Sequence, residues 1–136
     1  EVKVVSDQIG TPTYTFDLAR LLVDMIETDK YGYYHATNSE LPATESGYDE
    51  NGTKTGYISW YDFTKEIYRQ AGYKTKVTPV TTEEYSLFKA VRPFNSRLDK
   101  SKLEENGFKP LPTWTYAISR YLDILKDDGF FDELEK

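Results

Sequence analysis

The stretch EVKVVSDQIGTPTYTFDLARLLVDMIETDKYGYYHAT (residues 1–37) decides the fold class that the sequence predicts. Residues 1–5 are rich in valine, which is typical of a β-strand, and a turn containing glycine and proline ends the extended run. Apolar residues recur at three- and four-residue spacings over residues 14–27, which predicts an amphipathic helix with one buried face. The aromatic-rich residues 31–37 predict a second strand, and the intervening helix favours a parallel crossover. The sequence therefore indicates an α/β fold.

The first predicted helix has a clear start and a broad apolar face. Thr13 or Thr15 is suited to cap its N-terminus, because a threonine hydroxyl can accept a hydrogen bond from a free backbone N–H. The face that we expect to be buried consists of Phe16, Leu18, Ala19, Leu21, Leu22, Met25 and Ile26. Because the chain opens inside a strand with no leading tail, we expect it to be part of a longer protein.

Two more helices are predicted downstream, at 59–71 and 113–126, each with one apolar stripe. Ser59 and Asp62 resemble a capping box at the start of the first. The expected stripes are Trp60, Phe63, Ile67 and Ala71 in the first helix, and Trp114, Ala117, Ile118, Tyr121, Leu122 and Leu125 in the second.

The segments between these helices are shorter. Residues 74–80 alternate like a strand, a helical turn is expected at 85–88, and 99–105 predict a short helix that Asn106-Gly107 ends. We expect one domain over residues 1–126, since a chain of this size can bury a single core. It would carry a surface insertion at 39–57 and an acidic C-terminal tail at 127–136, with Phe130 and Phe131 as anchors.

Composition narrows the classes of function. The formal net charge of −6 argues against general attraction to nucleic acid or to an anionic membrane. No apolar run approaches the roughly 18 residues of a membrane span, and no signal-peptide pattern is visible. The absence of cysteine excludes disulfides and thiolate chemistry within this sequence and agrees with a cytoplasmic location.

Catalytic patterns are sparse in this sequence. His35 is the only histidine and lies in a predicted strand, which favours a structural role. None of the eight glycines forms the G-x-G-x-x-G pattern of a dinucleotide phosphate cradle. Two Tyr-x-x-x-Lys pairs, Tyr61 with Lys65 and Tyr85 with Lys89, are expected by chance among twelve tyrosines and are interpreted as helix-face neighbours.

A cationic stretch, RPFNSRLDKSK (residues 92–102), stands out in an otherwise acidic chain. An arginine fork such as that of Arg92 can hold a diphosphate in bidentate fashion, and Asn95 and Ser96 add hydrogen-bonding groups beside it. The alternative is a solvated strand followed by a helix that Asp99 caps. From the residues alone, both interpretations stay open.

Five ordered segments resemble those of the dTDP-4-dehydrorhamnose reductase family. They cover nearly the whole chain up to about residue 125, and their order is far more specific than any single segment. They are VSDQIGTPTY (residues 5–14) followed by DLA (17–19), GYYH (32–35), SWYDF (59–63), RPFNSRLD (92–99) and LPTW (111–114). The 39–57 segment looks longer than the usual connection of the family, and the acidic tail looks additional.

The resemblance implies the C-terminal, substrate-binding part of an extended short-chain dehydrogenase/reductase, without its Rossmann core. In such enzymes an N-terminal Rossmann domain binds NADPH or NADH and carries the catalytic residues, so this chain by itself is expected to be inactive. The substrate would be a dTDP-sugar, reduced at its C4 ketone to give dTDP-L-rhamnose. The 31–37 strand would extend the Rossmann sheet. A homodimer is compatible with the resemblance, which leaves a need for magnesium undecided.

The resemblance also implies roles for individual residues. Arg92 would contact the pyrophosphate of the substrate, supported by Asn95 and Ser96. The turn after the first strand would bring three further residues near the cleft, namely Gln8, Thr11 and Thr13. The SWYDF segment would be structural.

Two alternatives differ in class from this reductase. A non-catalytic binding or regulatory protein could keep the same sugar-nucleotide cleft without any chemistry. Another nucleotide-sugar epimerase or dehydratase is the second alternative, although the DQIGTPT segment (residues 7–13) argues against it. An upstream glycine-rich motif and a Tyr-x-x-x-Lys pair would favour a reductase over a regulator.

Overall fold

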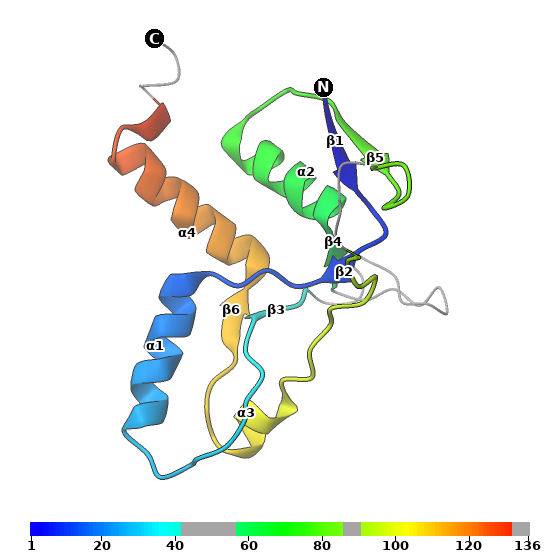
Figure 1. Ribbon diagram of the computed structural model, residues 1–136. Coiled ribbons are helices and arrows are strands. Elements are labelled where there is room, and N and C mark those ends of the chain that lie inside the picture. Colours follow the sequence, from blue (N-terminus) through cyan, green and yellow to red (C-terminus); the bar gives the residue numbers. More distant parts are fainter. Residues whose placement is uncertain (42–56, 86–90, 132–136) are drawn as a thin grey trace.

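The computed structural model describes residues 1–41, 57–85 and 91–131 of the chain. Four helices and six short strands form a mixed α/β structure, which confirms the predicted fold class (Figure 1). The helices are α1 (Thr15–Ile26), α2 (Trp60–Ala71), α3 (Ser101–Glu105) and α4 (Trp114–Asp127). The strands are β1 (Val2–Val5), β2 (Ile9–Gly10), β3 (Asn38–Ser39), β4 (Ile58–Ser59), β5 (Val77–Val80) and β6 (Leu111–Thr113).

The strands form three two-stranded sheets rather than one continuous sheet. β1 pairs with β5 in parallel, with Val2 opposite Val77 and Val5 opposite Val80. β2 pairs with β4 in antiparallel fashion, and β3 pairs with β6 in parallel. Segments far apart in sequence are therefore held together by short ladders, and the longest helices pack around them.

Helices α2 and α4 enclose the first of two apolar clusters, which we call the α2–α4 core. Its buried members come from β4 and α4, and α2 adds half-buried side chains. The predicted stripe of α4 is confirmed except at Tyr121, which is half exposed. The α2–α4 core comprises Ile58, Trp114, Ile118 and Leu122, with Leu41, Phe63, Ile67, Ala71, Leu125 and Phe131 packed against them.

The second cluster, which we call the α1 core, lies between α1, α3 and β6. It comprises Leu21, Leu103, Phe108 and Leu111, with Met25, Tyr34 and Ala36 packed against them. The prediction of a single buried face on α1 is wrong. The apolar residues extend too far around the helix for one contact surface, so Leu21 is buried whereas Phe16, Leu22, Val23 and Ile26 are exposed.

The predicted strand at 31–37 is also wrong for this chain. Regular pairing begins only at Asn38 and Ser39, which face β6. Within the described residues no second strand runs beside residues 32–37, so the backbone there has no ladder to join. Of the predicted insertion at 39–57, residues 42–56 lie outside the described residues, as do residues 86–88 of the expected turn at 85–88.

The helix ends follow local chemistry in most places. Ser59 and Asp62 form the predicted capping box, and Gly72 ends α2 in the left-handed conformation with φ of 78°. Gly107, with φ of 77°, follows α3 as predicted. At α1 the threonine cap is wrong, since Tyr14 is the N-cap and makes no capping bond through its side chain. Its backbone N–H instead donates to Asn38 Oδ1 at 2.6 Å.

A buried polar network joins α1, β3 and α4. Arg120 donates through Nη2 to both carboxylate oxygens of Asp17 at 2.5 Å. Asn38, only 1% exposed, donates to Asp17 Oδ2 at 2.8 Å and to the Pro112 carbonyl at 2.9 Å. The hydrogen bonds that Arg120 donates to Asp17 raise the pKa of Arg120 further above its ordinary value. This network fixes the α1 core relative to α4.

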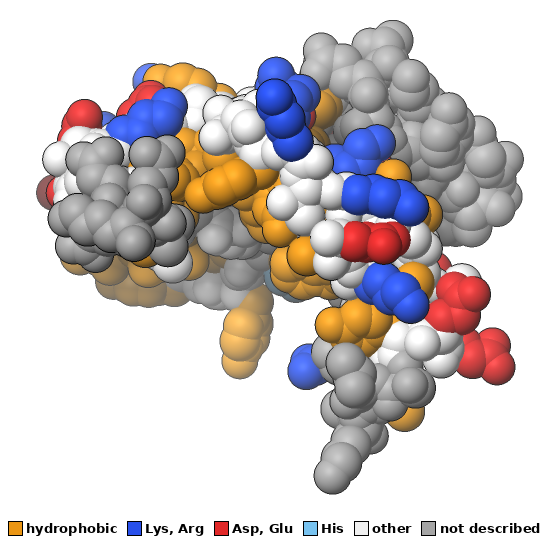
Figure 2. Space-filling model, turned by 90° about the horizontal axis from the view of Figure 1, so that it is seen from above, with side chains coloured by type: hydrophobic (Ala, Val, Ile, Leu, Met, Phe, Trp, Pro, Cys, Tyr) orange, Lys and Arg blue, Asp and Glu red, His pale blue; other side chains and the backbone are white. Residues whose placement is uncertain are grey.

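Apolar side chains remain at the surface between charged ones on the face shown in Figure 2. None of the helices in the described part of the chain has the length and apolar character needed to cross a membrane.

Candidate functional site

The two segments that carry most of the predicted site lie side by side. Ile9 of β2 donates its backbone N–H to the Phe94 carbonyl, and Ser96 donates to the Ile9 carbonyl, both at 2.8 Å. Ile9 and Asn95 form a parallel bridge. Residues 8–10 and 94–96, about 85 positions apart in sequence, are therefore joined through the backbone.

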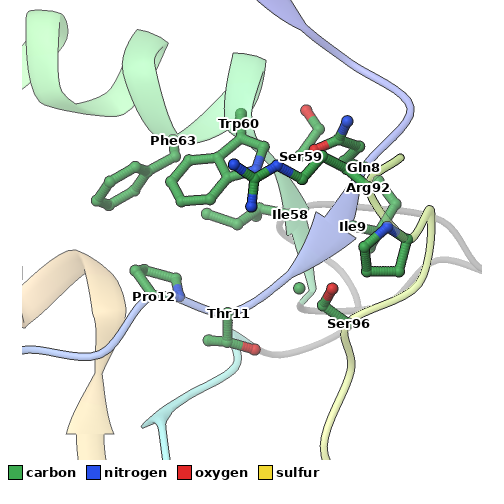
Figure 3. Close-up of a pocket in the computed structure, with 12 residues that line it drawn as sticks. Gln8, Ile9, Thr11, Pro12, Ile58, Ser59, Trp60, Phe63, Arg92 and Ser96 are labelled. Carbon is green, nitrogen blue, oxygen red and sulfur yellow. The ribbon is translucent and has the colours of Figure 1, made fainter. Parts of the chain in front are cut away.

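A cavity of about 290 Å³ opens where these two segments meet the start of α2. In Figure 3, Arg92 and Trp60 lie along one side of it, and Thr11, Pro12 and Ser96 lie along the opposite side. An adjoining cavity of about 450 Å³ shares Gln8, Trp60 and Arg92 with the first. The lining of the first cavity is Gln8, Ile9, Gly10, Thr11, Pro12, Ile58, Ser59, Trp60, Phe63, Arg92, Pro93 and Ser96.

Most of the predicted site residues are brought together here. Gln8, Thr11, Arg92 and Ser96 all line the cavity. Thr13 is exposed outside the lining, because the chain has already turned toward α1.

Asn95 also lies outside the lining of the cavity. Its Oδ1 accepts hydrogen bonds from the backbone N–H of Arg97 at 3.1 Å and from Arg97 Nε at 2.8 Å. In this arrangement the Asn95 side chain shapes the turn of the RPFNSRLD segment.

Hydrogen bonds from a neighbouring loop fix the first of the two segments. Asp7 accepts the backbone N–H of Thr82 at 2.9 and 3.1 Å and its hydroxyl at 2.7 Å. Gln8, which is buried, donates through Nε2 to Thr82 Oγ1 at 3.0 Å. The Gln8 amide is therefore held at the cavity wall by a partner from the end of β5.

Trp60 is the main cavity residue that the sequence analysis missed. We expected it in a buried stripe and the SWYDF segment in a purely structural role, but Trp60 is 55% exposed and lines both cavities. As the first residue after the Ser59 cap, it lies at the end of α2 nearest the RPFNSRLD segment. Its position beside the Ser59 cap is the only signal in the sequence that could have identified it.

The cations of residues 92–102 do not act as one cluster. Lys100 pairs with Glu40 and donates to Thr37 Oγ1 at 3.0 Å, and Lys102 donates to the Tyr33 carbonyl at 2.9 Å. Of the four cations predicted to form the patch, Arg92 alone lines the cavity. The cationic character of this site therefore rests on Arg92.

Titratable groups near α3 have structural roles. Asp99 accepts the backbone N–H of Ser101 at 2.9 Å, and hydrogen bonds from Ser101 lower the pKa of Asp99. The expectation that Asp99 is the N-cap is wrong, since Lys100 holds that position and makes no capping bond through its side chain. Burial, and then the carboxylate of Glu40, raise the pKa of Tyr57.

The histidine and the first tyrosine–lysine pair noted in the sequence have ordinary structural surroundings. Lys65 Nζ lies 5.1 Å from the centroid of the Tyr61 ring, as neighbours on a helix face do. His35 is exposed, with Nδ1 3.2 Å from the Asp99 carbonyl oxygen. Among the residues the structure describes, no three His, Asp or Glu side chains are grouped to hold a metal ion. Lys89 of the second tyrosine–lysine pair lies outside the described residues.

Proteins of known sequence show close similarity over most of the chain. The spore coat polysaccharide biosynthesis protein SpsK of Bacillus subtilis is 38% identical over 122 residues, covering 90% of this chain and 36% of SpsK. The dTDP-4-dehydrorhamnose reductase of Aggregatibacter actinomycetemcomitans is 34% identical and covers 85% of this chain and 37% of its own length.

Solved structures give the same result. A dTDP-4-dehydrorhamnose reductase from Clostridium acetobutylicum superimposes with a TM-score of 0.76 at 38% identity, over 92% of this chain and 39% of that one. The Bacillus anthracis enzyme, crystallised with NADP, gives a TM-score of 0.74 at 36% identity, over 89% of this chain and 37% of that one.

The chain spans between 36% and 39% of the length of these relatives, and the matched part is their C-terminal portion. Residues 1–127 match the family described as the RmlD substrate binding domain. The juxtaposed DQIGTPTY and RPFNSRLD segments and the cavity between them fit this match. The chain therefore belongs to the RmlD substrate binding domain family.

Proposed function

We propose that the intact protein is a dTDP-4-dehydrorhamnose reductase and that this chain supplies its sugar-nucleotide site. The observation that carries the proposal is the cavity between β2, α2 and residues 92–96, with Arg92 in its wall. Apolar side chains of Trp60, Phe63 and Ile58 suit a ring, and a guanidinium suits a diphosphate. The reaction proposed is reduction of the C4 ketone of dTDP-4-dehydro-L-rhamnose to dTDP-L-rhamnose.

The residues of this chain would bind and orient the substrate. Arg92 would hold the pyrophosphate, and Ser96, Thr11 and Gln8 would offer polar groups along the walls. We propose that Asn95 acts indirectly, by holding the turn that presents Ser96. Thr13 was expected near the substrate but lies outside the cavity lining, so we propose that it only leads the chain into α1.

A nicotinamide cofactor does not fit the residues of this chain. The sequence offers no glycine-rich cradle for a dinucleotide diphosphate. We propose that NADPH or NADH binds to an N-terminal Rossmann domain outside this chain, as the NADP complex of the Bacillus anthracis relative supports. We further propose a cytoplasmic location for the intact protein. We also propose that it forms a homodimer, which sedimentation of the purified protein would test.

Substitution of Arg92 tests the proposed function. In the intact protein, Arg92→Ala should weaken binding of dTDP by about 1.5–3 kcal/mol, the range for a charged hydrogen bond. Isothermal titration calorimetry with dTDP, and with UDP for base choice, measures the effect. Arg69→Ala is the matched control, because Arg69 is an exposed arginine on α2 that pairs with Glu66 away from this cavity.

Two outcomes would contradict the proposal. Unchanged dTDP affinity in Arg92→Ala would remove Arg92 from the substrate site. If the intact protein binds dTDP but does not oxidise NADPH or NADH in the presence of the 4-keto sugar, the non-catalytic binding protein becomes the better description.

A further inference from the structure

Tyr57 lies at the outer end of one wall of the cavity and contacts two cations of residues 92–102. It directly precedes β4, and the three residues that follow it line the cavity. Tyr57 is half-buried, and the centroid of its ring lies 5.7 Å from Arg97 Cζ and 5.7 Å from Lys100 Nζ. Cations at such distances are attracted by the electrons of an aromatic ring. One ring therefore joins two segments that are about 40 residues apart in sequence.

Arg97 belongs to the opposite wall of the cavity. It directly follows Ser96, which lies on the other side of the cavity from Trp60 in Figure 3. The Arg97 side chain is held on its own segment, because its Nε donates to Asn95 Oδ1 at 2.8 Å. β2 lies between the two walls, since it pairs with β4 and is also bridged to Asn95. The contact of Tyr57 with Arg97 thus reaches across β2 and joins the walls directly.

Lys100 connects the same ring to a further support. The Lys100 side chain is only 15% exposed and pairs with Glu40. Its Nζ also donates to Thr37 Oγ1 at 3.0 Å, and Thr37 is buried. Lys100 is therefore held by two side chains while it contacts the Tyr57 ring.

The ring and its two cations lie outside the cavity that they border. Tyr57, Arg97 and Lys100 are not part of its lining. Tyr57 and Lys100 instead line a separate cavity of about 300 Å³ beside α3. Any effect of these three residues on a ligand in the first cavity would therefore be transmitted through the walls.

The backbone ladders around the cavity are short, so side-chain contacts between the walls matter. β2 and β4 have two residues each, and residues 94–96 join β2 through two backbone hydrogen bonds. Small isolated pairs of strands are only marginally stable in water. A ligand that touches both walls binds more tightly when the walls already have the correct separation, because less order is lost on binding.

We propose that Tyr57, Arg97 and Lys100 form a clamp outside the cavity, which holds its two walls at a fixed separation and so positions the sugar nucleotide. The inference rests on the proposed function, because it takes this cavity to be the sugar-nucleotide site. The three clamp residues are positioning residues. Tyr57 is the centre of the clamp, because both cations contact its ring.

Hydrogen–deuterium exchange of the intact protein, read at single residues, tests the clamp itself. The amides of Ile9 and Ser96 form the backbone bonds between β2 and residues 94–96 and report how firmly they are joined. Tyr57→Leu removes the ring, so both amides should exchange at least about fivefold faster, the effect of one partly desolvated cation–π contact. Tyr57→Phe keeps the ring and should leave exchange within about twofold. Unchanged exchange in Tyr57→Leu, or equal acceleration in both variants, would overturn the clamp.

A double-mutant cycle isolates the contact between Tyr57 and Arg97. Arg97→Met also loses the bond to Asn95, so its own effect includes more than the contact. If the two residues act through each other, Tyr57→Leu should accelerate exchange less in the Arg97→Met protein than in the unsubstituted protein. The same acceleration in both proteins would remove Arg97 from the clamp.

Tyr61→Leu is the matched control for Tyr57→Leu. The Tyr61 ring also contacts a lysine, with Lys65 Nζ 5.1 Å from its centroid, but both residues belong to α2. Because this contact joins no two segments, exchange at Ile9 and Ser96 and the affinity for dTDP should not change. Acceleration equal to that in Tyr57→Leu would mean that loss of any tyrosine ring loosens the walls, and it would overturn the clamp.

Calorimetry of the same variants with dTDP tests the positioning role. Tyr57→Leu should raise the Kd for dTDP about fivefold, whereas Tyr57→Phe should raise it less than about twofold. Loss of folded protein alone would lower the stoichiometry of binding rather than raise the Kd. An unchanged Kd in Tyr57→Leu would overturn the positioning role.

These results separate the clamp from the proposed function. If the unsubstituted protein binds dTDP while exchange in Tyr57→Leu is unchanged, the clamp is wrong and the proposed function stands. If exchange follows the predicted pattern but the unsubstituted protein does not bind dTDP, the proposed function is wrong. The positioning of a sugar nucleotide is then wrong with it, and the contact between the walls stands.

Discussion

The α2–α4 core and the α1 core are built from similar residues but differ in how complete they are. Between α2 and α4, the apolar stripes of two long helices face each other, and Trp114 is only 3% exposed. Around α1 a single long helix packs on short segments, so Leu21 is buried whereas Ile26 on the same helix is 80% exposed. A helix that is apolar on both sides is normally covered on both sides.

The two cores also differ in their contact with the candidate site. The α2–α4 core closes on itself, and the cavity with Arg92 and Trp60 lies at its edge. The α1 core leaves large apolar side chains of α1, such as Leu22 and Ile26, exposed. The candidate site therefore lies beside the more completely buried of the two cores.

The largest effect is expected in the α2–α4 core. Trp114→Ala should lower the free energy of unfolding of the intact protein by about 3–5 kcal/mol, because it leaves a large cavity between two helices. Urea denaturation followed by circular dichroism measures it. Trp60→Ala, which removes the same side chain from a half-exposed position, should cost about 1 kcal/mol or less. Similar losses in the two variants would mean that the α2–α4 core is not the stable half.

The next largest effect on the free energy of unfolding is expected in the polar network that joins α1, β3 and α4. Arg120→Met leaves the buried Asp17 carboxylate with Asn38 as its remaining side-chain partner, so the free energy of unfolding should fall by about 2–3 kcal/mol. The estimate is below that for a fully buried pair because 26% of the Arg120 side chain is exposed.

Arg69→Met is the matched control for this variant. It breaks the exposed Glu66–Arg69 pair on α2 and should lower the free energy of unfolding by less than about 1 kcal/mol. If the loss in Arg120→Met is as small, Asp17 and Arg120 do not hold the two halves together.

Lowering the pH should have the smallest effect on the free energy of unfolding, and it should act mainly on the α2 side of the molecule. Hydrogen bonds lower the pKa of Glu1, Glu66 and Glu84, from Thr78, Arg69 and Thr81 respectively. A carboxyl with a lowered folded-state pKa stabilises the fold above its unfolded pKa, and that stability is lost as pH falls through the folded value. The free energy of unfolding should therefore be level near pH 6 and decline below about pH 4.5.

Exchange measured along the chain between pH 6 and pH 3 checks where this loss occurs. The β1–β5 pair and α2, where Glu1 and Glu66 accept their hydrogen bonds, should lose protection before the α1 core. Glu84→Gln should flatten part of the decline, since Gln does not titrate. Earlier loss in α1 would contradict this order.

Local patterns were enough to predict much of the fold. Ser59 and Asp62 form the predicted capping box, and the Phe63, Ile67 and Ala71 stripe packs in the α2–α4 core. Capping and helical periodicity depend on residues three or four apart, so a sequence can reveal them. For the candidate site, the motif segments predicted Gln8, Thr11, Arg92 and Ser96, which all line the cavity. No rule of sequence spacing predicted that these residues would be neighbours.

The sequence by itself determined the helices, the capping box of α2 and the family resemblance, because these depend on neighbouring residues and on motif order. Only the tertiary structure decided that residues 8–10 pair with 94–96, that Trp60 lines the cavity and that Asn95 does not. It also decided that residues 31–37 join no strand ladder within the part of the chain that the structure describes. A strand needs a partner, often one far away in the sequence, and the strand's own residues carry no record of where that partner lies.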